Sequence, residues 1–387
     1  MILTKESSLP YSNNLNTKAL AGLFNNTTNS YKFIFFISLI DILKRRDFVV
    51  NEPISFTELT IEMLANAWYP HSLFKLSFGT QDTISKKLDS LVLEITDPTL
   101  KFHDTDKNLL RNTIKIAIEQ GNSKRLMEFV PFRILSPFLE QELKDIDKAK
   151  WGVFEEAMPL IVNHNFHTRN PLYKFNSDER KKCTHIIFNT QWAEYFKENF
   201  SIIHGWASWH WLQYMQKRNP SSPNLINKLF VPSRRSSLNK QSIFWKKVLQ
   251  SKGTQDFHCI YSGAPLTDTN FSLDHYLPWS FVAHDQIWNL IPTPAEINSS
   301  KSNNLPHDSY LNKFIKFQHQ GLIIAKDIYS SREFDNKTEP FVADLPLNQT
   351  SDLLNFNKLH SAYTQTIIPL HLIAKNQGFS SSWLYSE

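Results

Sequence analysis

The chain of 387 residues has few cysteines, no long apolar run and, over one stretch, no acidic residue at all. Its only cysteines are Cys183 and Cys259, which excludes a disulfide framework and favours a reducing compartment. The first residues, MILTKESSLPYSNN, lack a basic region followed by an apolar run, so we expect no secretion signal. The most apolar segment, 31–43, is too short to cross a bilayer. These absences predict a cytoplasmic protein that does not enter membranes.

The composition predicts a globular chain whose first half is helical. Hydrophobic residues make up 41% and aromatic residues 13% of the sequence, which is enough for two or three packed domains. Apolar periodicity predicts helices over 33–43 and 106–120. Ser55 and Glu58 have the spacing of a capping box that opens another helix. Further helices are expected over 310–320 and 367–374, with loops between them.

Acidic residues are missing between Lys217 and Lys252. The basic residues of this stretch are Lys217, Arg218, Lys228, Arg234, Arg235, Lys240, Lys246, Lys247 and Lys252. Contacts to a phosphate backbone are largely electrostatic, so a segment of one charge sign is suited to holding nucleic acid. A charge run is also commonly a solvated face, and both interpretations stay open at this point.

Within this basic stretch, the residue pattern changes from loop to helix. Pro220, Pro223 and Pro232 predict a turning surface loop. Ser236 or Ser237 can then cap a helix. The expected apolar stripe of that helix is Leu238, Ile243, Phe244 and Val248, with Lys240, Lys246 and Lys247 lying elsewhere. Just upstream, Trp206, Trp209, Trp211 and Tyr214 are close together, and core packing is their expected use rather than stacking on bases.

Residues 273–306, LDHYLPWSFVAHDQIWNLIPTPAEINSSKSNNLP, bring together the groups needed to break a phosphodiester bond. This reaction needs a base to deprotonate water and a hard cation to neutralise charge at phosphorus. His275 can be the base and Asp274 a cation ligand. Adjacent residues of an extended strand point to opposite faces, so the strand should end at this pair.

The stretch resembles the ββα-metal (HNH) nuclease domains, and most closely the HNH domain of RNA-guided CRISPR effectors. The resemblance is carried by DHxxPxSF, then WNL, then NSSK. It implies that His275 is the general base and that Asp274 and Asn298 are metal ligands. It also implies that Asn289 braces the loop that holds the histidine, and that Lys301 touches a phosphate.

The donor set agrees with this resemblance. A carboxylate and an amide oxygen are hard ligands, so Mg²⁺ or Mn²⁺ is the expected ion. Many HNH proteins flank the site with two Cys-x-x-Cys knuckles that hold zinc, but Cys259 has no partner three residues on. No structural zinc is therefore expected. The expected substitutes are apolar residues: Ile260, Tyr261, Leu266, Phe271, Leu273, Trp279, Phe281, Trp288 and Ile291.

Residues 205–310 also look similar to free-standing bacterial HNH endonucleases encoded beside restriction or anti-phage genes. The predicted fold class is mainly α with an embedded ββα-metal unit, and α+β overall. The expected segments are a helical domain of unknown role over 1–200, a basic clamp over 201–252, the HNH domain over 253–310 and a helical extension over 311–387.

Three functions remain open on the sequence. The leading hypothesis is a metal-dependent HNH endonuclease acting on DNA, in which the N-terminal domain recognises a protein partner, a second copy of the chain, a ligand or a DNA feature. One HNH site cuts one strand per engagement, so nicking is expected unless two protomers act together. The alternatives are a DNA-binding module that lacks catalytic activity and an RNA-cleaving HNH toxin.

Overall fold

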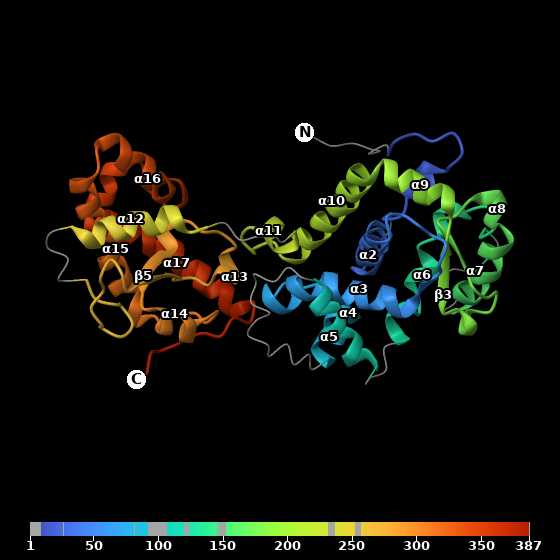
Figure 1. Cartoon of the computed structure of the whole chain (residues 1–387), viewed down its shortest axis with the longest axis horizontal. Helices are drawn as coiled ribbons and strands as arrows, with labels where there is room; N and C mark the ends of the chain where they lie inside the picture. The colour runs from blue at the N-terminus through green and yellow to red at the C-terminus, as the bar shows by residue number, and fades with distance from the viewer. Residues whose placement is uncertain are drawn as a thin grey trace. The chain divides into compact units, whose positions relative to one another are not determined.

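The computed structural model describes residues 9–25, 27–80, 82–91, 107–119, 124–144, 146, 152–230, 237–251 and 257–386. The chain forms two compact units, Met1–Pro220 and Ser221–Glu387 (Figure 1). Helices dominate both units, and the strands are few and short. The expectation of a mainly helical chain is therefore confirmed.

The first unit is built mainly from helices. Its helices are α1 (Thr17–Ala21), α2 (Tyr31–Arg45), α3 (Phe56–Trp68), α4 (Thr83–Ser90), α5 (Lys107–Glu119), α6 (Val130–Arg133), α7 (Val153–His164), α8 (Phe166–Arg169), α9 (Thr190–Glu198) and α10 (Phe200–Arg218). A single π-helical turn, Tyr69–Leu73, extends α3, and short 3₁₀ turns cover Lys124–Met127, Ser136–Phe138 and Arg180–Lys182. Strands β1 (Ile54–Ser55), β2 (Tyr173–Phe175) and β3 (His185–Phe188) form one antiparallel sheet in the order β1-β3-β2.

The centre of the first unit is α2, which is buried along most of its length. Phe35, Phe36 and Leu39 are fully buried, and α3 and α10 pack against this helix (Figure 1). The strongly apolar stretch 33–43 therefore forms the central helix that its sequence predicts. On α10, Trp206, Trp211 and Tyr214 are buried as expected, whereas Trp209 is exposed.

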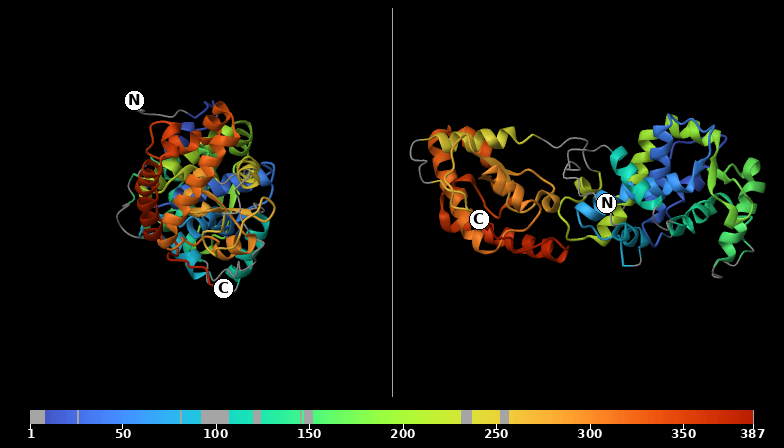
Figure 2. Two further views of the ribbon diagram at one scale, coloured as in Figure 1. Left: turned by 90° about the vertical axis from the view of Figure 1, so that its left-hand side faces the viewer. Right: turned by 60° about the horizontal axis from the view of Figure 1, so that its bottom comes forward.

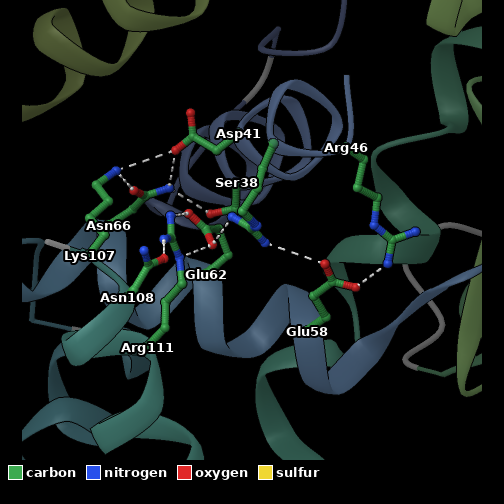
Figure 3. A network of polar contacts seen from close by, with 10 residues as sticks. Ser38, Asp41, Arg46, Glu58, Glu62, Asn66, Lys107, Asn108 and Arg111 are labelled. Carbon is green, nitrogen blue, oxygen red and sulfur yellow. Dashed lines mark hydrogen bonds and ion pairs between the residues drawn. The ribbon is translucent and has the colours of Figure 1, made fainter. Parts of the chain in front are cut away.

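A network of ion pairs joins α2, α3 and α5 (Figure 3). Its centre is Glu62, which is fully buried and bonded to Arg111 Nε at 2.7 Å and to Arg45 Nη1 at 2.9 Å. Burial alone would raise the pKa of Glu62, but the hydrogen bond and charge of Arg111, together with Arg45 and Lys107, lower that pKa overall. Ser55 is the N-cap residue of α3, and its hydroxyl accepts a hydrogen bond from the backbone N–H of Glu58 at 3.0 Å.

The second unit surrounds a small hairpin with helices. Its helices are α11 (Leu225–Leu229), α12 (Asn239–Gln250), α13 (Trp279–Val282), α14 (Ala295–Lys301), α15 (Ser309–Ile328), α16 (Ser331–Asp344) and α17 (Phe356–Asn376), with 3₁₀ turns over Ile287–Asn289 and Thr350–Leu354. Strands β4 (Ser272–His275) and β5 (Leu290–Thr293) pair antiparallel, with Asp274 opposite Ile291. The long helices α15 and α17 pack side by side (Figure 2). The prediction of loops between residues 320 and 367 is partly wrong, because α16 lies in that region.

One hydrophobic cluster runs through the whole second unit. It extends from Phe244 on α12, through Ile291 on β5, to Phe379 after α17. The segments expected over 253–310 and 311–387 thus share their core with each other and with α12. The sequence predicts four segments. In the structure, the boundary between the two compact units falls after Pro220 in the sequence.

Helices α12 and α15 approach unusually closely at one point. A Cβ at Gly321 of α15 would lie 2.5 Å from Cζ3 of Trp245 on α12, which no side chain could accept without a shift. Trp245 is fully buried there. Glycine therefore allows the indole to sit directly against the α15 backbone, which fixes α12 on the unit.

Within the described ranges, no helix combines the length and the apolar character needed to span a bilayer.

Candidate active site

The hairpin β4–β5 and the helix α14 bring the predicted site residues into one unit. Strand β4 ends at His275, where the sequence predicts that it must, and His275 pairs with Leu290 of β5. Pro294 follows β5 directly and begins α14, which packs on β4. Asp274 and His275 thus stand at the end of one strand, and Asn298 and Lys301 stand on the adjacent helix.

His275 is buried and is held by a carboxylate that the sequence motif does not predict. Its Nε2 lies 2.9 Å from Oδ1 of Asp285, in the loop between α13 and the 3₁₀ turn. A carboxylate on one ring nitrogen fixes the orientation of an imidazole and stabilises its protonated form. One feature of the sequence could have predicted this contact: Asp285 lies ten positions after His275, in a loop that must return to the hairpin.

The neighbouring His284 is a different kind of histidine. Its ring centre lies 5.3 Å from that of Trp288, and its Nδ1 accepts the backbone N–H of Gln286 at 3.2 Å. Burial lowers the pKa of His284 to about 4, against a smaller raising effect of Asp344. His284 therefore stays uncharged at neutral pH and serves the packing of the loop.

Asp274 is buried and both its oxygens have partners. Oδ2 accepts the hydroxyl of Tyr261 at 2.7 Å, and Oδ1 accepts Lys301 Nζ at 2.9 Å. Burial, and then the charge of Asp274, raise the pKa of Tyr261 well above its usual range. Tyr261 therefore remains a proton donor, and the Asp274 carboxylate keeps a fixed orientation.

Lys301 occupies a position different from the expected one. It is fully buried, and its Nζ also donates to the carbonyl oxygen of His275 at 2.6 Å. The expected contact of Lys301 with a phosphate does not match this position, because its ammonium is turned inward to Asp274. Lys301 lies one helical turn after Asn298, and on α14 this position faces the protein interior. The sequence spacing alone does not tell whether the side chain points inward or toward a bound phosphate.

Asn289 lies where a bracing residue is expected. It is fully buried, its Oδ1 accepts the backbone N–H of Leu277 at 2.9 Å, and its Nδ2 donates to the Leu277 carbonyl at 2.9 Å. The Asn289 carbonyl accepts the N–H of Tyr276 at 2.8 Å. These bonds fix the backbone directly after His275.

Asn298 turns its amide nitrogen toward β4. Nδ2 donates to Ser272 Oγ at 3.0 Å and to the Leu273 carbonyl at 3.2 Å. Among the described residues, nothing donates a hydrogen bond to its Oδ1, and the side chain is only partly buried. The amide oxygen is therefore the atom of Asn298 that can serve as a ligand.

The chemistry of these donors fits a hard divalent cation. Asp274 Oδ1 faces Lys301 of α14, and Asn298 of the same helix contacts β4 through its Nδ2, whereas the His275 ring is turned to Asp285. No group of three His, Cys, Asp or Glu side chains suited to a metal occurs in the part of the chain that the structure describes. A cation held by two protein oxygens would keep water and phosphate as its other ligands, which is typical of Mg²⁺.

The expected phosphate-binding residues are only partly described. Arg234 and Arg235 lie outside the described residues. Lys240, Lys246 and Lys247 are exposed on α12. From the same helix, Gln241 Nε2 donates to the Asp285 carbonyl at 3.0 Å, so the first turn of α12 lies against the loop that holds His275.

Cys259, which lacks a zinc-binding partner in the sequence, is a buried free thiol. It packs among the apolar residues that the sequence offers in place of a zinc knuckle, including Tyr261, Phe281 and Ile291. Of that group, Phe271 and Trp279 are only partly buried.

A comparison with protein families agrees with this geometry. Residues 259–307 match the model of a family described as HNH endonuclease. The match spans Asp274, His275, Asn289 and Asn298, so the chain carries an HNH endonuclease domain over these residues. Neither a curated protein nor a solved structure matches the chain. The domain implies binding of nucleic acid and suggests nuclease activity, for which HNH nucleases generally use divalent metal ions.

Proposed function

We propose that the protein is a metal-dependent HNH endonuclease that hydrolyses DNA phosphodiester bonds. The observation that carries this proposal is the placement of Asp274, His275 and Asn298 on one hairpin and its following helix, within the segment that matches the HNH family. Each of these side chains has the chemistry that the reaction requires.

His275 acts as the general base. It accepts a proton from the water that attacks phosphorus, while Asp285 holds the other side of the imidazole and stabilises the positive charge that forms. Asn289 keeps the backbone after His275 in place. A base needs its neutral form, so cleavage should fall in acid.

Asp274 and Asn298 would hold Mg²⁺ or Mn²⁺. Bound there, the ion would supply positive charge beside the phosphate and the leaving oxygen. Tyr261 and Lys301 keep the Asp274 carboxylate oriented in advance. The ammonium of Lys301 already pairs with Asp274, and this pairing is the observation that favours the second candidate, a DNA-binding module without activity.

Helix α12 supplies the contact to the nucleic-acid backbone. Lys240, Lys246 and Lys247 are exposed on it, and its Gln241 reaches the carbonyl of Asp285. A strand held along α12 therefore leads to the site. Arg234 and Arg235 precede this helix in the sequence and extend the same charge.

In the cell, we place the enzyme in the cytoplasm as an effector of a bacterial defence or restriction-like system. The first unit then recognises a protein partner or a second copy of the chain, and so controls the nuclease. One site cuts one strand per engagement, so a single protomer nicks DNA, and a pair of protomers is needed to break both strands.

The test compares three substrates. Supercoiled plasmid, single-stranded DNA and RNA are incubated with the protein and Mg²⁺, beside His275→Ala and the matched control His258→Ala, which changes an exposed histidine of the same unit. We expect the wild type and the control to nick plasmid, His275→Ala to leave it intact, and EDTA to stop cleavage until Mg²⁺ or Mn²⁺ is restored. Binding without cutting under every divalent ion would establish the DNA-binding module, and cleavage of RNA alone would establish a ribonuclease.

A further inference from the structure

The short helix α11 and the residue before it hold the turn that ends α13. Nδ2 of Asn224 donates to the Val282 carbonyl at 2.8 Å, and Nδ2 of Asn227 donates to the Ala283 carbonyl at 3.2 Å. Ala283 has a φ of 52°, in the left-handed region that residues other than glycine seldom adopt. The turn therefore depends on neighbours that hold its backbone in place.

A buried lysine anchors the same segment at a second point. Lys228 is fully buried, its Nζ donates to Ser222 Oγ at 2.8 Å, and the ammonium lies 5.2 Å from the centre of the Phe281 ring. Burial lowers the pKa of Lys228 to about 7. Burial of a lysine costs desolvation free energy, and the contacts of Lys228 with Ser222 and Phe281 offset this cost.

The turn at Ala283 lies just before Asp285, whose carboxylate contacts His275. Asp285 follows Ala283 by two residues, its Oδ1 bonds to His275, and its carbonyl accepts Gln241 from α12. Asn224, Asn227 and Gln241 all lie outside the segment 259–307 that matches the HNH family. The backbone that carries Asp285 is thus fixed by residues that precede the family domain in the sequence.

We infer that Asn224 and Asn227 are positioning residues of the nuclease site, acting on His275 through the turn at Ala283 and the carboxylate of Asp285. This inference rests on the proposed function. It gives the asparagines of the NLINKL string a role in catalysis that requires no contact with nucleic acid.

The experiment is a double-mutant cycle in the full-length protein. Single-turnover nicking of plasmid is measured for the wild type, for Asn224→Ala with Asn227→Ala, for Asp285→Asn, and for all three changes together. If the asparagines act through Asp285, the asparagine pair and Asp285→Asn should each slow cleavage about 10- to 100-fold, and the triple variant should be no slower than the slower of the two. Ile226→Ala is the matched control, because Ile226 is exposed on the same helix and should cut at the wild-type rate.

Amide hydrogen exchange supplies a readout that is independent of cleavage. Peptides covering 279–288 should exchange faster in the asparagine pair than in the wild type or in Ile226→Ala. If the asparagine pair does not fold, Asn227→Ala alone takes its place, since it removes only the hydrogen bond to the Ala283 carbonyl.

The outcomes separate this inference from the proposed function. Wild-type rates in the asparagine pair would overturn the inference, and so would a triple variant whose loss equals the product of the two separate losses. If the wild type cuts no substrate, the proposed function fails, and the exchange of 279–288 alone then decides whether the asparagines hold the turn.

Discussion

At the scale of single residues, the candidate site contains a cation of its own. The Lys301 ammonium is fully buried against Asp274, so the carboxylate is neutralised without any bound ion. Removal of one partner from a buried pair leaves an uncompensated charge, which costs far more than the pair contributes. A divalent ion on Asp274 would offset that loss, because it supplies the missing positive charge.

Lys301→Met should therefore lower the free energy of unfolding by about 3 kcal/mol at neutral pH. Added Mg²⁺ should raise the midpoint of urea unfolding more in this variant than in the wild type, because the ion binds only the folded site. The control is Lys375→Met, which changes an exposed lysine on α17. Equal unfolding midpoints in Lys301→Met and the wild type would show that Asp274 does not need this ammonium.

The sequence predicts which residues come together in the candidate site better than it predicts where their side chains point. The spacing predicts Asp274, His275, Asn289 and Asn298 as site residues, and β4 ends at His275, as the sequence also predicts. It gives the wrong direction to Lys301, because a helical offset from Asn298 does not say which face of α14 is buried. It also misses Asp285, whose contact with His275 depends on the path of the loop.

At the scale of elements, helix α12 combines packing and exposed charge. Phe244, Trp245 and Val248 are buried, whereas Ile243, expected in the apolar stripe, is exposed. The stripe is displaced because Trp245 takes the position against Gly321. A sequence pattern cannot show such a close approach, since it depends on a residue from a distant helix.

Replacement of Lys240, Lys246 and Lys247 by Gln should weaken DNA binding and flatten its dependence on salt. Each lost phosphate contact should reduce the slope of log K against log salt by roughly 0.9. The measurement is fluorescence anisotropy with a DNA duplex at several salt concentrations. Lys313, Lys316 and Lys375, exposed on α15 and α17, give a control triple with the same change of charge. An unchanged slope in the α12 triple alone would remove this helix from the interface.

The network of α2, α3 and α5 should make the first unit sensitive to acid (Figure 3). The pKa of Glu62 is lowered in the folded protein, so its contribution is complete above the usual range for glutamate and is lost as pH falls through the folded pKa. Glu62→Gln should cost about 2 kcal/mol near neutral pH, from the loss of charged hydrogen bonds to two arginines.

The difference between Glu62→Gln and the wild type should shrink toward zero as the pH is lowered. Urea unfolding followed by tryptophan fluorescence between neutral and acidic pH would measure it. Glu58→Gln is the control and should cost less, because Glu58 is more exposed than Glu62. A difference that is constant over the whole pH range would rule out this network as the source of acid sensitivity.

At the scale of the whole molecule, the extent of the hydrophobic core decides which fragments can fold. The core of the second unit begins at Phe244, before the HNH family match, and continues to Phe379, well beyond it. The sequence predicts domain limits at 253 and 310, because the residues of the HNH motif lie between them. The apolar residues that support this chemistry are dispersed over a longer stretch and carry no motif.

The fragment Ser221–Glu387 should fold alone and retain nicking activity, because its core is closed within it. The fragment 253–310 should not fold, because it lacks Trp245 and Val248 on one side and Phe314 and Ile315 on the other. Circular dichroism and thermal unfolding of the two fragments would check this. Cooperative unfolding of 253–310 would show that the HNH segment is an independent domain.

The contact between Trp245 and Gly321 sets α12 rigidly on the unit that carries His275. If α12 binds the nucleic-acid backbone as proposed, a helix fixed in this way keeps a constant distance between the phosphates that it binds and the phosphate that is cleaved. Nicks made by such an enzyme would fall at a constant interval from the edge of its footprint. Replacement of Gly321 by a larger residue would displace α12 and make the positions of the nicks less uniform.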